Sequence, residues 1–490
     1  MNLPPSLLLT PKVQRSVSLC ITLTSCLLLS AGSLFGQVQK LGAIVDLEED
    51  AQQPQLSRIA KRSLEDLPSR VDLRPYCPVP GDQGNHGTCT AWSSAYHGRT
   101  ILEAISADRR SKSENTKEAF SPSFVYNQIR STGGCDQGTS VPSALSLMKR
   151  KGALKAQVLK FNCSFTAWDK YRDITEPYKI YGYLKLHEPF SNNKVLPVKK
   201  ALAEKQPVLC SMHLEKSFHQ PKNGRYVPSS SERQVVIDFN FMRDGKYKGH
   251  AMCVVGYDDK VGRNGAFLLI NSWGTSWGNG GYCWVEYEDY ARFVVQSYSM
   301  VNPPSYDDNL SGAIVMETEK GQRMTVKHNP AKQAYTLDEN WLAGTRFRLY
   351  LENQSPVHLY AFGFDESGQA SAVFPYAPRV SSLIPYKKNY VPIPDEEHFI
   401  EIEDTPGRNE LCVLYSNKEV DLDKLIKAIN VRGKAIVQKD LSIDVVIREE
   451  LNKLGITPVP TNQIQYINNE VRFTSKRLKE QCVPLVIRFR

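Results

Sequence analysis

Residues 82–92 read DQGNHGTCTAW, and this stretch decides the fold and the chemistry that we predict for the chain. A loop with glycines runs directly into an apolar segment, and Cys89 stands at the junction. Apolar residues from Thr90 to Ala104 have the spacing of a buried helix. Helix N-termini carry unpaired N–H groups and partial positive charge, which favour a thiolate over a thiol. Because the thiolate is the nucleophilic form, this position predicts a reactive Cys89.

A lone cysteine at a helix start is more often structural, so the prediction depends on a partner base. His250 stands directly before an apolar strand predicted from Ala251 to Tyr257. Farther along, residues 268–278 read LLINSWGTSWG, and Asn271 ends a second predicted strand. The Asn271 amide oxygen can accept a hydrogen bond from the imidazole of His250. That bond would fix the tautomer and aim the other ring nitrogen at the sulfur.

In this order, these segments resemble the papain family of cysteine peptidases, and the resemblance covers residues 68–290. It implies an α+β fold with a helical lobe that carries Cys89, a β lobe that carries His250, and a cleft between them. It also implies that Cys89 is the nucleophile and His250 the general acid and base, with Asn271 orienting His250.

The resemblance assigns further residues around the cleft. The Gln83 side chain and the Cys89 backbone N–H would form the oxyanion hole. Trp273 would shield the Asn271–His250 bond, Trp277 would line the leaving-group side, and Gly138 would belong to the substrate wall. At the position of His86 the family usually has a disulfide-bonded cysteine, so that bridge is expected to be absent. His86 itself reads as a loop residue that lines the cleft, because nothing nearby would orient it as a base.

The order of predicted elements divides the chain into several regions. Helices, including one from Ser143 to Lys151, precede a run of strands in a papain-like domain at residues 66–300. A Pro-rich, Asp-rich linker follows, and then a β-rich, sandwich-like accessory domain at residues 305–430 and a C-terminal extension at residues 431–490. The accessory domain resembles an uncharacterised domain found on exported bacterial proteins, so a partner protein or a cell-surface component is its expected ligand.

The N-terminus has the composition of an export signal. Lys12 and Arg15 precede an apolar run from Val17 to Ala31, so residues 1–36 are predicted to be a signal peptide. A retained membrane anchor and a lipid-modified Cys26 are the alternatives. Residues 37–65 read as a linker or a short pro-segment, too short for the helical inhibitory pro-domain that is usual in the family. The expected location is periplasmic, cell-surface or secreted, in a bacterium.

Charge and cysteine usage narrow the remaining possibilities. The net charge of +9 is scattered and forms no basic stripe, so we do not expect a nucleic-acid partner. Of 11 cysteines, those outside the signal are odd in number, which suggests one reactive thiol and several pairs. Cys135 and Cys163 could pair, while Cys253 and Cys283 would be buried thiols or a disulfide. His213 and His219 are expected to face solvent. We predict no metal and no cofactor.

Three functions fit this pattern. The first is an endopeptidase that acts as a monomer on protein or peptide substrates. The second is an acyl transferase or transpeptidase, which would share the acyl-enzyme and differ only in the acceptor. The third is a catalytically silent surface protein whose cleft binds peptides. The complete set of Gln83, Cys89, His250 and Asn271 favours catalysis.

Overall fold

The computed structural model describes residues 39–55, 67–131, 133–164, 167–304, 310–385, 391–395, 397–402, 409–467, 470–475 and 481–489. The predicted signal at residues 1–36 lies outside these ranges, and only residues 39–55 of the predicted linker or pro-segment at residues 37–65 lie within them. Within the described residues, the structure contains no helix with the length and apolarity that a membrane span requires.

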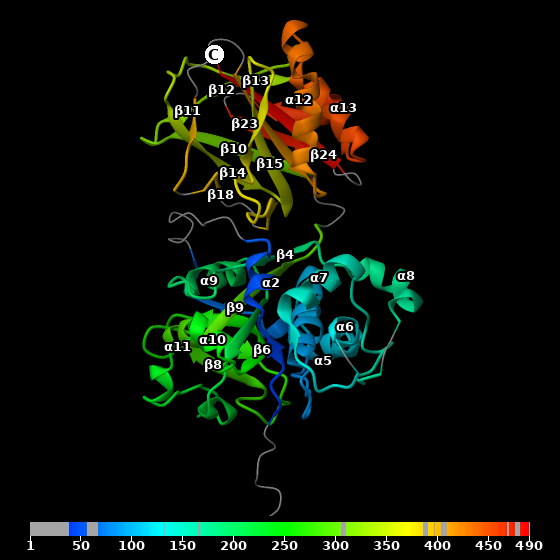
Figure 1. The fold of residues 1–490 in the computed structure, drawn as a ribbon, viewed down its shortest axis with the longest axis vertical. Coiled ribbons are helices and arrows are strands. Elements are labelled where there is room, and N and C mark those ends of the chain that lie inside the picture. Colours follow the sequence, from blue (N-terminus) through cyan, green and yellow to red (C-terminus); the bar gives the residue numbers. More distant parts are fainter. Residues whose placement is uncertain are drawn as a thin grey trace, which may run out of the picture. The chain divides into compact units, whose positions relative to one another are not determined.

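A helical layer carries Cys89. Helix α3 (Cys89–Ala91) continues through the π-helical stretch η3 (Trp92–Arg99) into α4 (Thr100–Ser106), so the predicted helix is present. Its π-helical middle is a feature that apolar spacing does not reveal. The other helices of this layer are α5 (Lys112–Lys117), α6 (Pro122–Ile129), α7 (Val141–Lys151) and α8 (Arg172–Thr175). Figure 1 shows α5, α6 and α7 grouped together, on the opposite side of this part of the chain from β8 and α11.

A twisted sheet in the order β4-β9-β5-β6-β7-β8 carries His250, and β2 pairs with β6. Its strands are β2 (Arg70–Asp72), β4 (Gly182–Lys185), β5 (Val208–His213), β6 (Gly249–Asp258), β7 (Ala266–Ile270), β8 (Tyr282–Glu286) and β9 (Val294–Val301). Helices α9 (Val195–Ala203), α10 (Phe239–Arg243) and α11 (Tyr287–Phe293) accompany it. The antiparallel register pairs Cys253 with Ile270. Asn271, the residue after β7, therefore reaches the end of β6 where His250 lies.

The C-terminal part is a sandwich of two sheets with a helical layer on one of them. One sheet contains β10 (Leu310–Thr318), β11 (Arg323–Met324), β14 (Arg346–Asn353), β18 (Val391–Ile393), β19 (Ile400–Glu401), β22 (Ile464–Ile467) and β23 (Val471–Ser475). The other contains β12 (Val326–Asn329), β13 (Ala334–Leu337), β15 (Val357–Asp365), β16 (Ala370–Phe374), β17 (Leu383–Ile384), β20 (Asn409–Ser416), β21 (Thr457–Pro458) and β24 (Gln481–Phe489). Helices α12 (Leu422–Gln438) and α13 (Ile443–Lys453) lie side by side in this part (Figure 1).

Strand β15 shows how the sequence builds these layers. Leu359 and Ala361 belong to the core between the two sheets, whereas Tyr360 and Phe362 belong to the core under the helices. Successive side chains of a strand point to opposite faces, so a strand buried on both faces is apolar throughout. The segment after residue 430, which the sequence suggests is an extension, supplies β23 and β24 to the two sheets.

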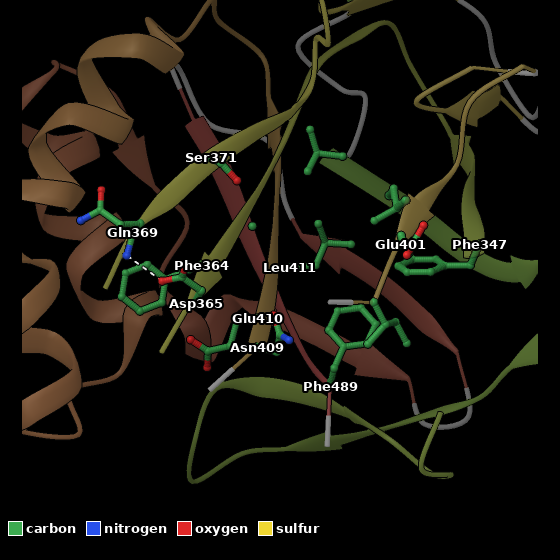
Figure 2. A pocket seen from close by; sticks show the side chains of 14 residues that line it. Phe347, Phe364, Asp365, Gln369, Ser371, Glu401, Asn409, Glu410, Leu411 and Phe489 are labelled. Carbon is green, nitrogen blue, oxygen red and sulfur yellow. Dashed lines mark hydrogen bonds between the residues drawn. The ribbon is translucent and has the colours of Figure 1, made fainter. Parts of the chain in front are cut away.

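A small cavity of about 120 Å³ opens between the two sheets, and Figure 2 shows its lining. The rings of Phe347 and Phe489 lie 5.5 Å apart along one wall. The carboxylate of Glu410, which also lines the cavity, forms an ion pair of 2.6 Å with Arg488. The charge of this buried carboxylate is therefore compensated within the sandwich.

Candidate active site

Cys89 is the first residue of helix α3 and is completely buried. Its Sγ atom accepts a hydrogen bond of 3.4 Å from the backbone N–H of Ala251. Ala251 follows His250 on strand β6. The helical layer and the sheet therefore meet at this sulfur, and the cysteine lies beside the strand that carries the predicted base.

His250 is also completely buried, and its ring is held by one strong hydrogen bond. The Nε2 atom of His250 and the Oδ1 atom of Asn271 are 2.7 Å apart. The same Oδ1 atom accepts a hydrogen bond of 2.7 Å from the backbone N–H of Ser272, so Nε2 must be the donor. The Nδ1 atom is buried and has no hydrogen-bond partner among the described residues.

Gln83 is fixed from both ends of its side chain. The Ser272 hydroxyl donates to its Oε1 atom at 2.6 Å, and its Nε2 atom donates to the carbonyl of His86 at 2.6 Å. The backbone N–H of Gln83 donates to the Ser272 carbonyl at 2.9 Å. The loop before Cys89 is therefore joined to the loop after Asn271, and the amide N–H₂ of Gln83 points along the loop that leads to Cys89.

Burial keeps both members of the pair neutral in this structure. Burial raises the pKa of the Cys89 thiol, although hydrogen bonds from the backbone of Ala251, Gly42 and Thr90 act in the opposite direction. Burial lowers the pKa of His250 to about 4, the hydrogen bond with Asn271 opposes this shift, and the charge of His219 adds to it. Charged forms are disfavoured wherever water is excluded. A thiol and a neutral imidazole are therefore the stable forms here.

Water is excluded because residues 42–44 lie beside Cys89, where the sequence predicts the cleft. Strand β1 (Ala43–Ile44) pairs in parallel with β3 (Thr139–Ser140), and the Thr139 N–H donates to the Gly42 carbonyl at 2.9 Å. A Cβ atom placed on Gly42 would lie 2.2 Å from the carbonyl oxygen of Gly87, so the two backbones are in direct contact. Gly42 also hydrogen bonds to the Cys89 sulfur. Residues 42–44, the cleft segment, therefore cover the sulfur.

A short helix, α2 (Leu47–Ala51), anchors the cleft segment to the sheet. The buried carboxylate of Asp50 lies 2.9 Å from the Nζ atom of Lys185 on β4. It also accepts hydrogen bonds from Gln296 and Tyr298 on β9. A buried ion pair with several further hydrogen bonds fixes geometry well, because breaking one partner leaves an uncompensated charge. The sequence gives no signal for this anchor, because its partners lie far apart along the chain.

The predicted cleft residues fall into two groups. Trp273 packs against the His250 ring with 4.7 Å between ring centroids, and Trp277 packs edge-on against Trp273 at 5.4 Å. Gly138 borders the cleft segment, because a Cβ atom there would lie 2.8 Å from the Gly42 carbonyl oxygen. His86 instead lies against the sulfur atoms of Cys135 and Cys163, all within 4.8 Å of one another.

Cys135 and Cys163 form a disulfide, as the sequence suggested. Sulfur atoms in a disulfide are not available as thiolate ligands, so the cluster of His86, Cys135 and Cys163 is not a metal site. Cys253 and Cys283 are buried free thiols. Burial raises the pKa of both thiols, so neither forms the reactive thiolate readily.

The expectation that His213 faces solvent is wrong, whereas His219 is only partly exposed. His213 is 3 % exposed and its Nδ1 atom accepts a hydrogen bond from the Lys248 N–H at 3.0 Å. His219 is half-buried, and its ring stacks on Trp273 with centroids 5.1 Å apart and planes 8° apart. The 3-10 helix η6 (Lys216–His219), which directs this ring onto the indole, is too short to leave a periodic signal in sequence.

Residues 67–302 match the model of the papain family cysteine proteases, and residues 341–419 match a domain of unknown function named DUF4384. A cysteine protease of Blomia tropicalis is 27 % identical over 225 residues, which are 45 % of this chain and 61 % of the relative. Mouse cathepsin K is 26 % identical over 219 residues, which are 44 % of this chain and 59 % of the relative. The chain therefore spans about three-fifths of the length of these relatives.

Among solved structures, xylellain, a cysteine protease from Xylella fastidiosa, has 20 % sequence identity and a TM-score of 0.42. The similarity covers 54 % of this chain and 96 % of that one.

Proposed function

We propose that the chain is an exported cysteine endopeptidase, starting from the premise that its residues 67–302 belong to the papain family. One observation carries the proposal. The Cys89 sulfur lies against the backbone of β6 next to His250, whose Nε2 atom is bound to Asn271 and whose Nδ1 atom has no hydrogen-bond partner in the described chain. This is the arrangement of nucleophile, base and orienting group that acyl transfer needs.

Each group then has a defined role in the reaction. The Cys89 thiolate attacks the carbonyl carbon of the peptide bond, and the carbonyl electron pair moves to oxygen. The Gln83 amide and the Cys89 backbone N–H donate to that oxyanion. Collapse breaks the C–N bond, and imidazolium Nδ1 of His250 gives its proton to the leaving amine. Water, deprotonated by His250, then cleaves the thioester and releases the Cys89 thiolate.

The covered cleft supports a latent form of this enzyme. Residues 42–44 take the space next to Cys89 that a substrate needs, and the same covering keeps thiol and imidazole neutral. Removal of the segment would readmit water and restore the thiolate–imidazolium pair. We propose that activity appears only after the segment leaves the cleft.

Selective labelling and digestion test the peptidase. Under reducing conditions, and once residues 42–44 have left the cleft, the full chain should cut a denatured protein at internal bonds, and Cys89→Ala should abolish cleavage. Cys482→Ala, which removes another buried thiol, is the matched control and should retain activity. Iodoacetamide should label Cys89 before the other thiols once the cleft opens. Even labelling of all thiols without any cleavage would contradict the proposal and leave a silent peptide binder.

Export and the role of the C-terminal sandwich are also proposals. The predicted signal at residues 1–36 supports export. The sandwich is proposed to hold the peptidase at a cell-surface component or a partner protein. Recovery of the full chain only from the cytoplasmic fraction of the native host would contradict export.

A further inference from the structure

A second imidazole packs against the same indole that contacts the ring of His250. His219 stacks on Trp273 in a parallel arrangement, at 5.1 Å, and Trp273 in turn packs against the ring of His250 at 4.7 Å. Phe218 and Trp277 pack around the same indole. The His219 ring remains half-exposed, whereas Trp273 is 3 % exposed, so the imidazole is the polar group that this wall presents to solvent.

This wall borders the leaving-group side of the cleft. His250 gives its proton to the leaving amine, so side chains packed against the His250 ring adjoin the residues that depart with that amine. The opposite side is marked by the cleft segment, which lies against Gly87, Gly138 and Gly249. A substrate's leaving-group portion would therefore run past Trp273 and its neighbour His219.

We propose that His219 is a specificity-determining residue: in its imidazolium form it favours substrates with an acidic side chain just after the scissile bond. The proposal rests on the peptidase activity inferred above and goes beyond it, because it names a substrate preference and makes that preference depend on pH. With a neutral His219, substrates with an acidic and with an uncharged side chain after the scissile bond would be cleaved about equally well.

The preference should appear only in acid. Burial lowers the pKa of His219 below its usual 6.5, so the imidazolium is scarce at neutral pH and accumulates as the pH falls. Several charged or titratable groups lie around this wall. Glu215 and Lys216 precede His219 in the chain, and Glu232 accepts a hydrogen bond from Ser217. Asp82 lies beside Gly274, and His250, with Cys89 near it, packs against Trp273. Glu232 is already bound by Ser217 and Ser229, which leaves the outer edge of the imidazolium for a substrate carboxylate.

The test uses two peptides that differ only in Asp or Asn after the cleaved bond, with the full chain in reductant after the cleft segment has been displaced. The ratio of kcat/KM for Asp over Asn should rise about 3-fold between pH 7.5 and pH 5.0, the size of an exposed ion pair. In His219→Gln this ratio should not change with pH. His328→Gln is the matched control, because His328 is also a half-buried imidazole stacked on a ring, that of Tyr466, in the C-terminal sandwich. It should behave like the unmodified chain.

A ratio that rises equally in His219→Gln, or that stays flat in the unmodified chain, would overturn the proposal. A loss of activity without any change in the ratio would show a merely structural role and would overturn it as well. If no peptide is cut, the peptidase proposal fails. A second measurement then tests whether a charged His219 ring stacks on Trp273. An imidazolium stacked on Trp273 should change tryptophan fluorescence during an acid titration, and the step should disappear in His219→Gln. Absence of the step in the unmodified chain would exclude the charged stack.

Discussion

At the scale of single residues, the role of Gln83 depends on the hydrogen bonds that orient its side chain. Its Oε1 atom accepts the Ser272 hydroxyl, so its N–H₂ group faces the other way, toward the His86 carbonyl in the loop that leads to Cys89. Gln83→Ala should lower kcat by roughly 10²–10³, the usual effect of losing one oxyanion donor. Ser272→Ala should have a smaller effect, because it frees the amide to rotate without removing the donor.

Steady-state kinetics on a single peptide check this prediction, with Gln157→Ala as the control. Gln157 is an exposed glutamine that donates to the Lys117 carbonyl, far along the chain from the site. Near-normal kcat in Gln83→Ala would remove this side chain from the mechanism.

The candidate site residues that the sequence predicts are those whose chemistry leaves few alternatives. Cys89, His250 and Asn271 could be placed in order because a thiolate needs a helix start, a base and an orienting oxygen. Ser272 was not predicted, since its bond to Gln83 joins loops 189 positions apart. The stacking of His219 on Trp273 is not predicted either, because only the folded loop brings the two rings together.

At the scale of elements, the cleft segment is the part whose removal should change activity most. In Gly42→Ala the new Cβ atom would lie 2.2 Å from the Gly87 carbonyl oxygen, and neither backbone has room to move. Overpacking of this kind costs about 1–3 kcal/mol. The covered form should lose that stability relative to the open form, so iodoacetamide should label Cys89 about ten times faster.

Gly133→Ala is the matched control, because its Cβ atom would have no neighbour within 4 Å. Asp50→Asn provides a second route to the same end, since it removes the charge that pairs with Lys185 and loosens helix α2. Unchanged labelling in both Gly42→Ala and Asp50→Asn would show that residues 42–44 do not limit access to the sulfur.

Helices and strands are predicted where apolar residues recur over a long run, and they are missed where a short strand pairs with a segment far away in the sequence. The helix after Cys89 and the strands that flank Asn271 follow from runs of spaced apolar residues. The segment at residues 37–65 was recognised as too short for a helical pro-domain, but a two-residue strand such as β1 has no period to detect. Its parallel partner β3 lies nearly a hundred residues later.

At the scale of the whole molecule, order along the chain predicted the α+β layout and the β-rich C-terminal part. It did not predict that the last strand completes the sandwich. Strand β24 lies between β13 and β20, so the end of the chain forms the middle of a sheet. The neighbours of a strand depend on contacts with high sequence separation, which local patterns do not encode.

Two buried histidines make the stability of the papain-like part depend on pH. Burial lowers the pKa of His97 and of His187 to about 3, from a usual value of 6.5. Between these values the unfolded chain binds protons that the folded chain does not, so stability is complete above pH 6.5 and falls as the pH drops toward 3. Each such histidine contributes a slope of at most about 1.4 kcal/mol per pH unit.

The thermal unfolding midpoint should therefore fall steadily from pH 7 to pH 4, and His97→Gln should make that fall shallower. His97 accepts only one long hydrogen bond, 3.4 Å from the Gly81 N–H, so an amide at this position loses little in neutral buffer. His187→Gln should act in the same direction but start from a lower midpoint, because His187 is bound to both Ser297 and the Glu188 carbonyl. Midpoint curves that run parallel in the unmodified chain and both variants would mean that these rings are charged, or exposed, in the folded protein.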